Sequence, residues 1–411
     1  MTFDVRTTDV RTTEPRATGT ATAAEMSRAA FLRRAAVMGI LASAGALTAT
    51  TPAAARAASG RRPPGRGGLT HRGVCYDTGT DFTADGELTR PLWSQAILAT
   101  DLRAIHQGLH CNAVTLLGTD VGRLTEAASC ALERGLHVLV QPRPFDRPQR
   151  EILDHLARTA RAAERLRAHR GPEVILVVGC EYLFFAPGIV PGATFLDRMR
   201  YLAEETYDIR VFLRRLNAFL AKAAAVARRH FHGRISYGAA AGLEEIDWSP
   251  FDVVGLDYYA YHREPAAHTR ELARYRRWRK PITIVETGCC TYEGAAQRGR
   301  DGWDVVDYEG DVPVIEGGLV RSEREQARHL AFMLAVFEAE GLLGASPYQF
   351  IDCESPHHAT APKYDLDMAG YGLVKVIRED HLDPASPYRW EPKRSFHAVA
   401  AHHARALRRR S

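Results

Sequence analysis

The feature that most constrains the fold is an alternation of short apolar runs with longer stretches of helical periodicity, which begins near residue 70. Parallel strands joined by crossover helices produce this rhythm, because helices that cover such a sheet leave its strands almost continuously apolar. The runs that predict buried strands cover residues 73–76, 113–117, 138–141, 174–179, 235–238, 253–257, 282–285 and 348–351.

Most of the segments between these runs carry apolar residues at the spacing of an amphipathic helix. The eight predicted strands and their helices indicate an α/β fold, a closed (β/α)8 TIM barrel over residues 70–411 with long loops at its C-terminal face. No GxGxxG or phosphate-binding loop follows an early strand, which argues against a nucleotide-binding fold. The predicted helices cover residues 92–107, 122–134, 148–169, 207–231, 266–278, 322–340 and 391–409. The connection between the fifth and sixth predicted strands, around Leu243–Trp248, is short.

The first 57 residues predict a targeting segment. Residues 1–25 are rich in Thr, Ala and Arg without apolar periodicity, as in a disordered extension. A basic stretch, a short apolar run and a small-residue site then follow over residues 27–57, the pattern of a cleavable export signal that resembles a twin-arginine signal. The apolar run is shorter than the roughly 20 residues of a membrane-spanning helix. We therefore expect a secreted protein without stable membrane insertion after cleavage, with a flexible linker over residues 58–69.

Charge and cysteine content narrow the function classes. The formal net charge is only +5, and no basic patch interleaved with aromatic residues is present, so we expect no nucleic-acid partner. The seven cysteines include no CxxC pair, and we expect buried thiols, with one or two disulfides as the alternative. Six residues could form a metal site only if the fold brought them together at the barrel mouth: Cys180, Cys289, Cys290, Cys353, His357 and His358. Their spacing in the sequence matches no zinc motif, so we expect no metal and no cofactor.

The candidate site lies at the carboxyl ends of the predicted strands, where the active sites of such barrels form. Glu181 directly follows the fourth strand and Glu286 ends the seventh. Hydrolysis of a glycosidic bond needs two carboxyl groups on opposite sides of the anomeric carbon, and these strands lie across the barrel mouth from each other. We therefore expect Glu181 and Glu286 to be the catalytic pair. The expected substrate-binding residues are Asp77, Gln141, Arg143, Asp257, Tyr258, Tyr259, Trp303 and Asp352.

Several of these residues admit a second role. Asp352 and Glu354 are rival carboxylates for the catalytic pair, and a strand-end glutamate can also be structural, paired with an arginine. Arg143 fits sugar binding and neutralisation of Glu181 equally well, and Asp77 also fits an anchor of the first loop. Two long loops, residues 182–199 and 289–317, are expected to cover the mouth.

Three stretches resemble the clan of retaining (β/α)8 glycoside hydrolases: residues 251–259 (FDVVGLDYY), 281–288 (PITIVETG), and 372–374 with 390–396 (GLV and WEPKRSF). The resemblance implies a carbohydrate substrate, with Glu181 as acid/base and Glu286 as nucleophile. It also implies that Tyr258 or Tyr259 binds the nucleophile. The clan usually has Asn before the acid/base, where this chain has Cys180, and this difference favours an alternative, a non-catalytic carbohydrate-binding barrel.

Residues 286–296 (ETGCCTYEGAA) are also similar to actinobacterial barrel proteins of unknown activity, some of them labelled abortive infection proteins. That resemblance implies a third possibility, a partner-binding protein with a role in phage resistance.

Overall fold

The computed structural model describes residues 3–4, 69–82, 86–170, 174–204, 206–308, 310 and 312–408. Its centre is a sheet of parallel strands whose spatial order follows their order in the chain. The strands are β2 (His71–Arg72), β3 (Cys75–Asp77), β4 (Ala113–Gly118), β5 (His137–Pro142), β6 (Val174–Cys180), β7 (Arg234–Ala240), β8 (Val254–Asp257), β9 (Ile282–Thr287) and β12 (Gly344–Pro347).

β2 and β3 belong to one extended segment, and this segment closes the sheet into a barrel. β2 pairs with β12, and β3 pairs with β4. Between the two strands, the Gly73 amide donates to Ala345 O at 2.9 Å and the Thr115 amide donates to Val74 O at 3.0 Å. A Cβ atom at Gly73 would lie 2.5 Å from Ser346 Oγ, so any larger residue at this joint would displace the Ser346 side chain. The predicted (β/α)8 barrel is therefore confirmed.

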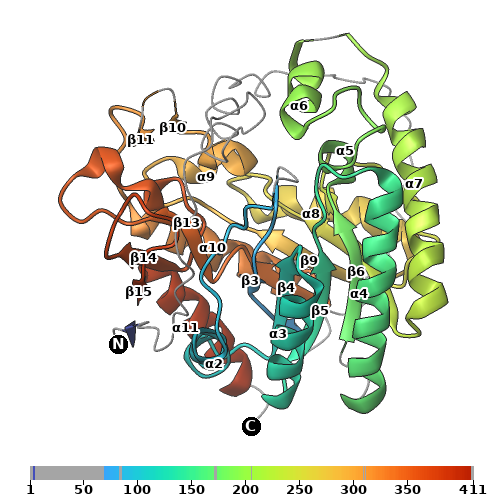
Figure 1. Ribbon diagram of the computed structural model, residues 1–411, viewed down its shortest axis with the longest axis horizontal. Coiled ribbons are helices and arrows are strands. Elements are labelled where there is room, and N and C mark those ends of the chain that lie inside the picture. Colours follow the sequence, from blue (N-terminus) through green and yellow to red (C-terminus); the bar gives the residue numbers. More distant parts are fainter. Residues whose placement is uncertain are drawn as a thin grey trace, which may run out of the picture.

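Amphipathic helices lie outside the strands, as predicted (Figure 1). In the long helix between β6 and β7, for example, Leu216, Phe219 and Ala223 are buried on one face. The connection between β7 and β8 contains no helix, within the described chain. The outer helices are α2 (Gln95–Arg103), which continues as η2 (Ala104–Gly108), α3 (Val121–Glu133), α4 (Gln149–Arg170), α7 (Ile209–His230), α8 (Pro265–Ala273), which continues as η3 (Arg274–Trp278), α10 (Glu323–Ala339) and α11 (Arg394–Arg408).

The end of the chain differs from the prediction. The eighth barrel strand is β12 and not residues 348–351, because hydrogen bonding to β9 and β2 selects Gly344–Pro347 although this stretch is poor in strand-forming residues. Residues 348–351 instead lead into a second sheet that the sequence analysis missed, and the last helix consequently starts at Arg394. This sheet contains β13 (Ile351–Pro356), β14 (Val374–Arg378), β15 (Tyr388–Pro392) and β1 (Phe3–Asp4).

Both predicted long loops carry secondary structure of their own. The loop after β6 contains α5 (Tyr182–Phe185) and α6 (Phe195–Glu204), and Figure 1 shows α6 at the top of the view. The loop after β9 contains α9 (Ala295–Arg298), η4 (Gly299–Trp303) and the antiparallel pair β10 (Val306–Asp307) and β11 (Val314–Ile315). Two short turns, η5 (Pro362–Tyr364) and η6 (Leu366–Met368), follow β13.

The predicted export signal and nearly all of the predicted linker lie outside the described residues. None of the described helices combines the length and the hydrophobicity that a membrane crossing requires. All seven cysteines are free thiols, and six of them are buried. This agrees with the expectation of buried thiols and not with the alternative of one or two disulfides.

Asp101 of α2 connects the closing strand to the second sheet. Its carboxylate forms an ion pair with Arg90 and accepts hydrogen bonds from Tyr76 Oη and Trp390 Nε1, each at 3.0 Å. All four side chains are at most 2% exposed, so each polar group depends on the others for its partners.

We expect Asp101→Ala to lower the free energy of unfolding by about 3–5 kcal/mol, because it leaves the Arg90 guanidinium buried without a counterion. Chemical denaturation measures this loss. The control, Asp154→Ala, breaks an exposed pair with Arg150 in α4 and should change stability by less than about 0.5 kcal/mol. Equal midpoints for Asp101→Ala and wild type would contradict the role of this network.

Candidate active site

Glu286 lies at the end of β9, where two donors hold its carboxylate. Arg143, just after β5, forms an ion pair with Oε1, and Tyr259 Oη donates to Oε2 at 3.0 Å. Arg143 is itself fixed by Gln141, whose Oε1 accepts from Nη2 at 2.8 Å and from Nε at 3.1 Å. Both Arg143 and Gln141 are buried, so the positive charge compensates the negative charge of Glu286 in a region with little water.

Glu181 directly follows β6 in a left-handed conformation, with φ 44° and ψ 41°. Such a conformation costs a non-glycine residue on the order of 1 kcal/mol, and it persists where neighbouring contacts enforce it. Here the Glu181 amide donates to Gly238 O at 2.9 Å, and the Tyr182 amide donates to Tyr237 Oη at 2.6 Å. The strained turn is therefore held against β7.

Glu244, in the connection after β7, holds the same turn from the other side. Its carboxyl group accepts from the amides of Leu183 and Ala240 at 2.9 Å each, and from Tyr237 Oη at 3.0 Å. Burial raises the pKa of Glu244 to about 8. Glu244 was not predicted as a site residue, because it lies inside a connection and not at a strand end. Only the fold brings it to the turn at Glu181.

Burial also raises the pKa of the Glu181 carboxyl group, and the positive charges of Arg300 and Arg143 oppose this shift in part. Arg300 lies in the loop after β9 and donates to Ala241 O at 3.0 Å. Among the described residues, none donates a hydrogen bond to the Glu181 carboxylate. A carboxyl group whose pKa is raised, and which has no protein partner for its proton in the described chain, is suited to donate that proton to a ligand.

Both glutamates line one cavity of about 310 Å³ at the mouth of the barrel. This volume lies at the lower end of the roughly 300–1,000 Å³ that is usual for ligand sites. The predicted residues Arg143, Tyr259, Trp303 and Asp352 line it as well, as does the rival carboxylate Glu354. Residues that were not predicted as site residues complete the lining; among them are Arg300, Gln349, Tyr371, Phe82, Phe195 and Met199.

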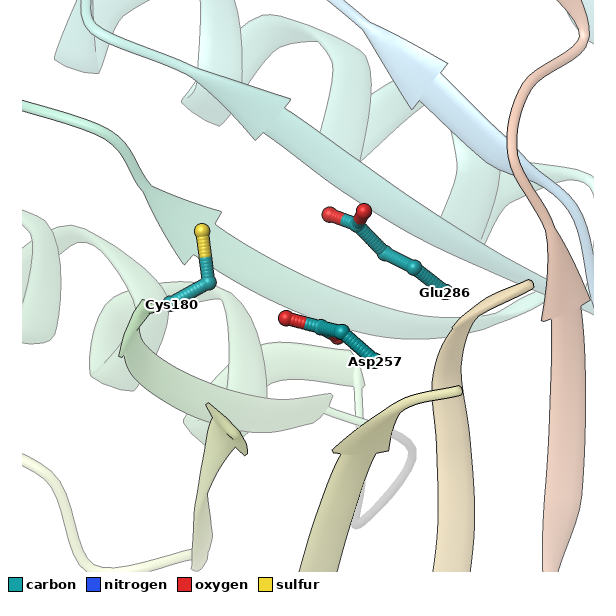
Figure 2. Close-up of side chains that lie close together, drawn as sticks. All are labelled: Cys180, Asp257 and Glu286. Atoms are coloured by element: carbon teal, nitrogen blue, oxygen red, sulfur yellow. The ribbon is translucent and has the colours of Figure 1, made fainter. Parts of the chain in front are cut away.

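Asp257, at the end of β8, lies next to Glu286 and Cys180. Figure 2 shows the three side chains gathered around a common space, and their potential ligand atoms all lie within 4.8 Å of one another. Asp257 is 1% exposed, and neither of its carboxyl oxygens has a hydrogen-bond partner among the described residues. Burial, followed by the nearby charge of Glu181, raises the pKa of Asp257 well above its ordinary value. The neutral acid is therefore the favoured form.

A protonated Cys180 and Asp257 beside a Glu286 that is paired with Arg143 fit these contacts better than a metal site does. The Arg143 guanidinium already binds Glu286, and its positive charge also acts on Cys180 and Asp257, so a divalent cation would meet repulsion there. Cys289, Cys290, Cys353 and His358 join no group of potential metal ligands in the described chain.

His357 does belong to such a group, together with Asp365 and Asp367. Ion pairs with Arg321 and Lys393 already satisfy these two carboxylates. The group is therefore a salt-bridge network.

Four predicted binding residues do not line the cavity: Tyr258, Asp77, Gln141 and Asp257, whose burial is described above. Tyr258 Oη contacts His268 Nδ1 at 2.8 Å, toward α8, because neighbouring residues at a strand end face opposite sides and Tyr259 takes the inward side. Asp77 accepts from Thr80 Oγ1 at 2.9 Å and from the Gly79 amide at 3.0 Å, which makes it the anchor of the first loop. Gln141, as described above, positions Arg143.

Comparison with known proteins supports the fold. No family model and no curated protein sequence matches the chain. A structure of a GH113 beta-1,4-mannanase in a complex matches with a TM-score of 0.54 and 15% identity, covering 82% of this chain and 99% of that one. A second GH113 beta-1,4-mannanase structure matches with a TM-score of 0.52, at the same identity and coverage. The chain therefore has the (β/α)8 fold found in glycoside hydrolases.

We expect Asp257→Asn to become more stable relative to wild type as the pH rises. The pKa of Asp257 is raised in the folded state, so unfolding above its ordinary value of 3.8 releases a proton. The wild type thus loses stability as pH rises from that value toward the raised pKa, by at most about 1.4 kcal/mol per pH unit, and Asn has no proton to lose. Denaturant titrations between about pH 4 and pH 8 test this, with the exposed Asp154→Asn as control. A stability difference that is independent of pH would contradict the prediction.

Proposed function

We propose that this protein is a retaining glycoside hydrolase with Glu181 as acid/base and Glu286 as nucleophile. One observation carries the proposal: two carboxyl groups from opposite parts of the barrel line the same cavity in contrasting environments. The Arg143 guanidinium binds Glu286, whereas burial raises the pKa of Glu181. Paired carboxyl groups whose environments differ in this way divide into an anion and an acid.

The reaction follows from these two states. In the first step Glu181 donates its proton to the glycosidic oxygen, Glu286 attacks the anomeric carbon, and the bond to the leaving group breaks. In the second step ionised Glu181 takes a proton from water, the water oxygen attacks the anomeric carbon, and the Glu286 carboxylate leaves. Arg143 and Tyr259 donate to Glu286, so they stabilise the carboxylate before attack and again as it departs.

The sugar ring binds among the polar residues at the strand ends. Asp352 and Gln349 line the cavity beside the catalytic pair. The side-chain oxygen of Gln349 is buried without a hydrogen-bond partner in the described chain, so a donor such as a sugar hydroxyl would satisfy it after a small movement. The matched structures are named as beta-1,4-mannanases, so β-mannosides belong among the first substrates to test. Because the sequence predicts an export signal, we propose that the substrate lies outside the cell membrane.

A carbohydrate-binding barrel without catalysis is the second candidate. Cys180 precedes Glu181 where the clan usually has Asn, and its buried thiol lies beside Asp257 and Glu286. A thiol is a weak donor, so it binds a sugar hydroxyl less well than an amide does.

We expect wild-type protein to hydrolyse at least one aryl glycoside in a panel that includes 4-nitrophenyl β-mannoside, with net retention in the first-formed product by NMR. Glu286→Gln should lower kcat at least roughly 1,000-fold, because it removes the nucleophile. Glu181→Gln should lower kcat less for substrates whose leaving group needs no proton. Glu151→Gln, at an exposed position of α4, is the control. Hydrolysis that survives Glu286→Gln would remove the assignment, and glycan binding without hydrolysis would favour the second candidate.

Arg300→Gln should move the alkaline limb of the kcat/KM pH profile to higher pH. The positive charge of Arg300 opposes the rise in the pKa of Glu181, and the acid is active only when protonated. Without that charge the proton is retained to higher pH. Arg298→Gln, on the exposed side of the same loop, should leave the limb unchanged. A limb that stays in place, or that moves to lower pH, in Arg300→Gln would contradict Glu181 as the acid.

A further inference from the structure

The cavity has two chemically different parts. Its floor, at the strand ends, carries the carboxyl groups and Arg143, as described above. One wall comes from the loops after β3, β6, β7 and β9, and most of the lining residues in these loops are apolar. The segment after β12 forms the other side of the cavity and is more polar, with Gln349, Asp352, Glu354 and Ser355 in the lining. The apolar wall consists of Phe82, Phe185, Phe195, Met199, Leu243 and Trp303.

Direct ring contacts connect the floor to this wall. The Arg143 guanidinium, which binds Glu286, lies 5.9 Å from the centre of the Phe145 ring. Phe145 stacks on Phe185 at 3.9 Å, and Phe185 stacks on Phe195 at 4.9 Å, with interplanar angles of 16° and 11°. These contacts connect the apolar wall to the floor through the buried ring of Phe145.

The loops above the two catalytic strands both contribute to the wall. Phe195 begins α6, in the loop after β6, and Trp303 ends η4, in the loop after β9. Phe82, Phe195 and Trp303 all pack against the buried side chain of Leu196, so the two loops share one apolar contact. The three rings are only partly buried, and they keep surface open to the cavity.

A second sugar fits this wall poorly. Proteins bind a sugar ring by stacking it on a free aromatic face and by pairing its hydroxyl groups with polar side chains. Both faces of Phe185 are covered by Phe145 and Phe195, so Phe185 presents only its edge. Hydroxyl groups placed against Phe195, Met199 and Leu243 would lose their hydrogen bonds to water without replacement, which is unfavourable.

We propose that the substrate is a glycoside whose sugar binds at Glu181 and Glu286 and whose leaving group is an apolar alkyl or aryl group, bound between α6 and Trp303. The inference rests on the proposed function for the position of the sugar. A cavity of about 310 Å³ leaves room for one sugar ring and an apolar group of modest size.

Calorimetry tests the inference with octyl glycosides of mannose, glucose and galactose in both anomeric forms, kept below their micelle concentrations. Each is compared with the disaccharide in which a second hexose replaces the octyl group. Both wild type and Glu286→Gln are titrated, so that binding is measured without turnover. We expect at least one octyl glycoside to bind roughly tenfold more tightly than its disaccharide.

Variants of the wall locate the effect. Phe195→Ala should weaken octyl-glycoside binding roughly tenfold while disaccharide binding changes less than about twofold, and Phe195→Leu should restore most of the loss because it returns apolar volume. Phe332→Ala is the matched control, since this partly buried ring lies on α10 against His268. Denaturation curves establish that each variant is folded.

The inference is overturned if disaccharides bind as tightly as octyl glycosides, if no member of the panel binds, or if Phe195→Ala and Phe332→Ala have equal effects. Octyl-glycoside binding that depends on Phe195, without hydrolysis of any aryl or alkyl glycoside, would refute the proposed function and leave the binding preference intact. The two failures are therefore distinguishable.

Discussion

The closure of the barrel by the segment from His71 to Asp77 is the constraint on which the rest of the structure depends. This segment bonds to β12 on one side and to β4 on the other, so the strands form a ring. In a ring the carboxyl ends of all strands surround one mouth. Residues as distant in sequence as Arg143 and Glu286 can then meet, and the loops after β6 and β9 build walls around the same cavity.

The mouth concentrates more acid than base, and the structure accommodates this charge by protonation as well as by pairing. Glu286 has Arg143 as its counterion. Burial raises the pKa values of Glu181, Glu244 and Asp257, and the charge of Glu181 adds to the shifts of Glu244 and Asp257. Several like charges in a region with little water are costly, so neutral acids relieve the repulsion. Glu286, which has a counterion, and Glu181, whose pKa is raised, therefore lie in contrasting environments.

The predicted features that the structure confirms were those with strong local signals. The apolar runs of β4 to β9 and the helical spacing around them identified the barrel. The rule that sites lie at strand ends predicted Glu181, Glu286 and Tyr259 as site residues; the structure places all three around one cavity, and their roles stay a prediction. The eighth strand was misplaced because Gly344–Pro347 has a weak strand pattern and is selected by its neighbours. Glu244 and Arg300 were missed for the same reason: each reaches the site through contacts between segments far apart in sequence.

The sequence by itself determined where strands and helices alternate, because strands that are buried beneath helices must be apolar. It thereby also determined which residues stand at the strand ends. Only the tertiary structure decided how those residues share protons and charge. Arg143 lies against Glu286, Tyr259 faces the cavity while Tyr258 faces α8, and Asp257 is sealed beneath the pair. These outcomes depend on distances across the barrel and on exclusion of water, which are properties of the closed ring and of no single segment.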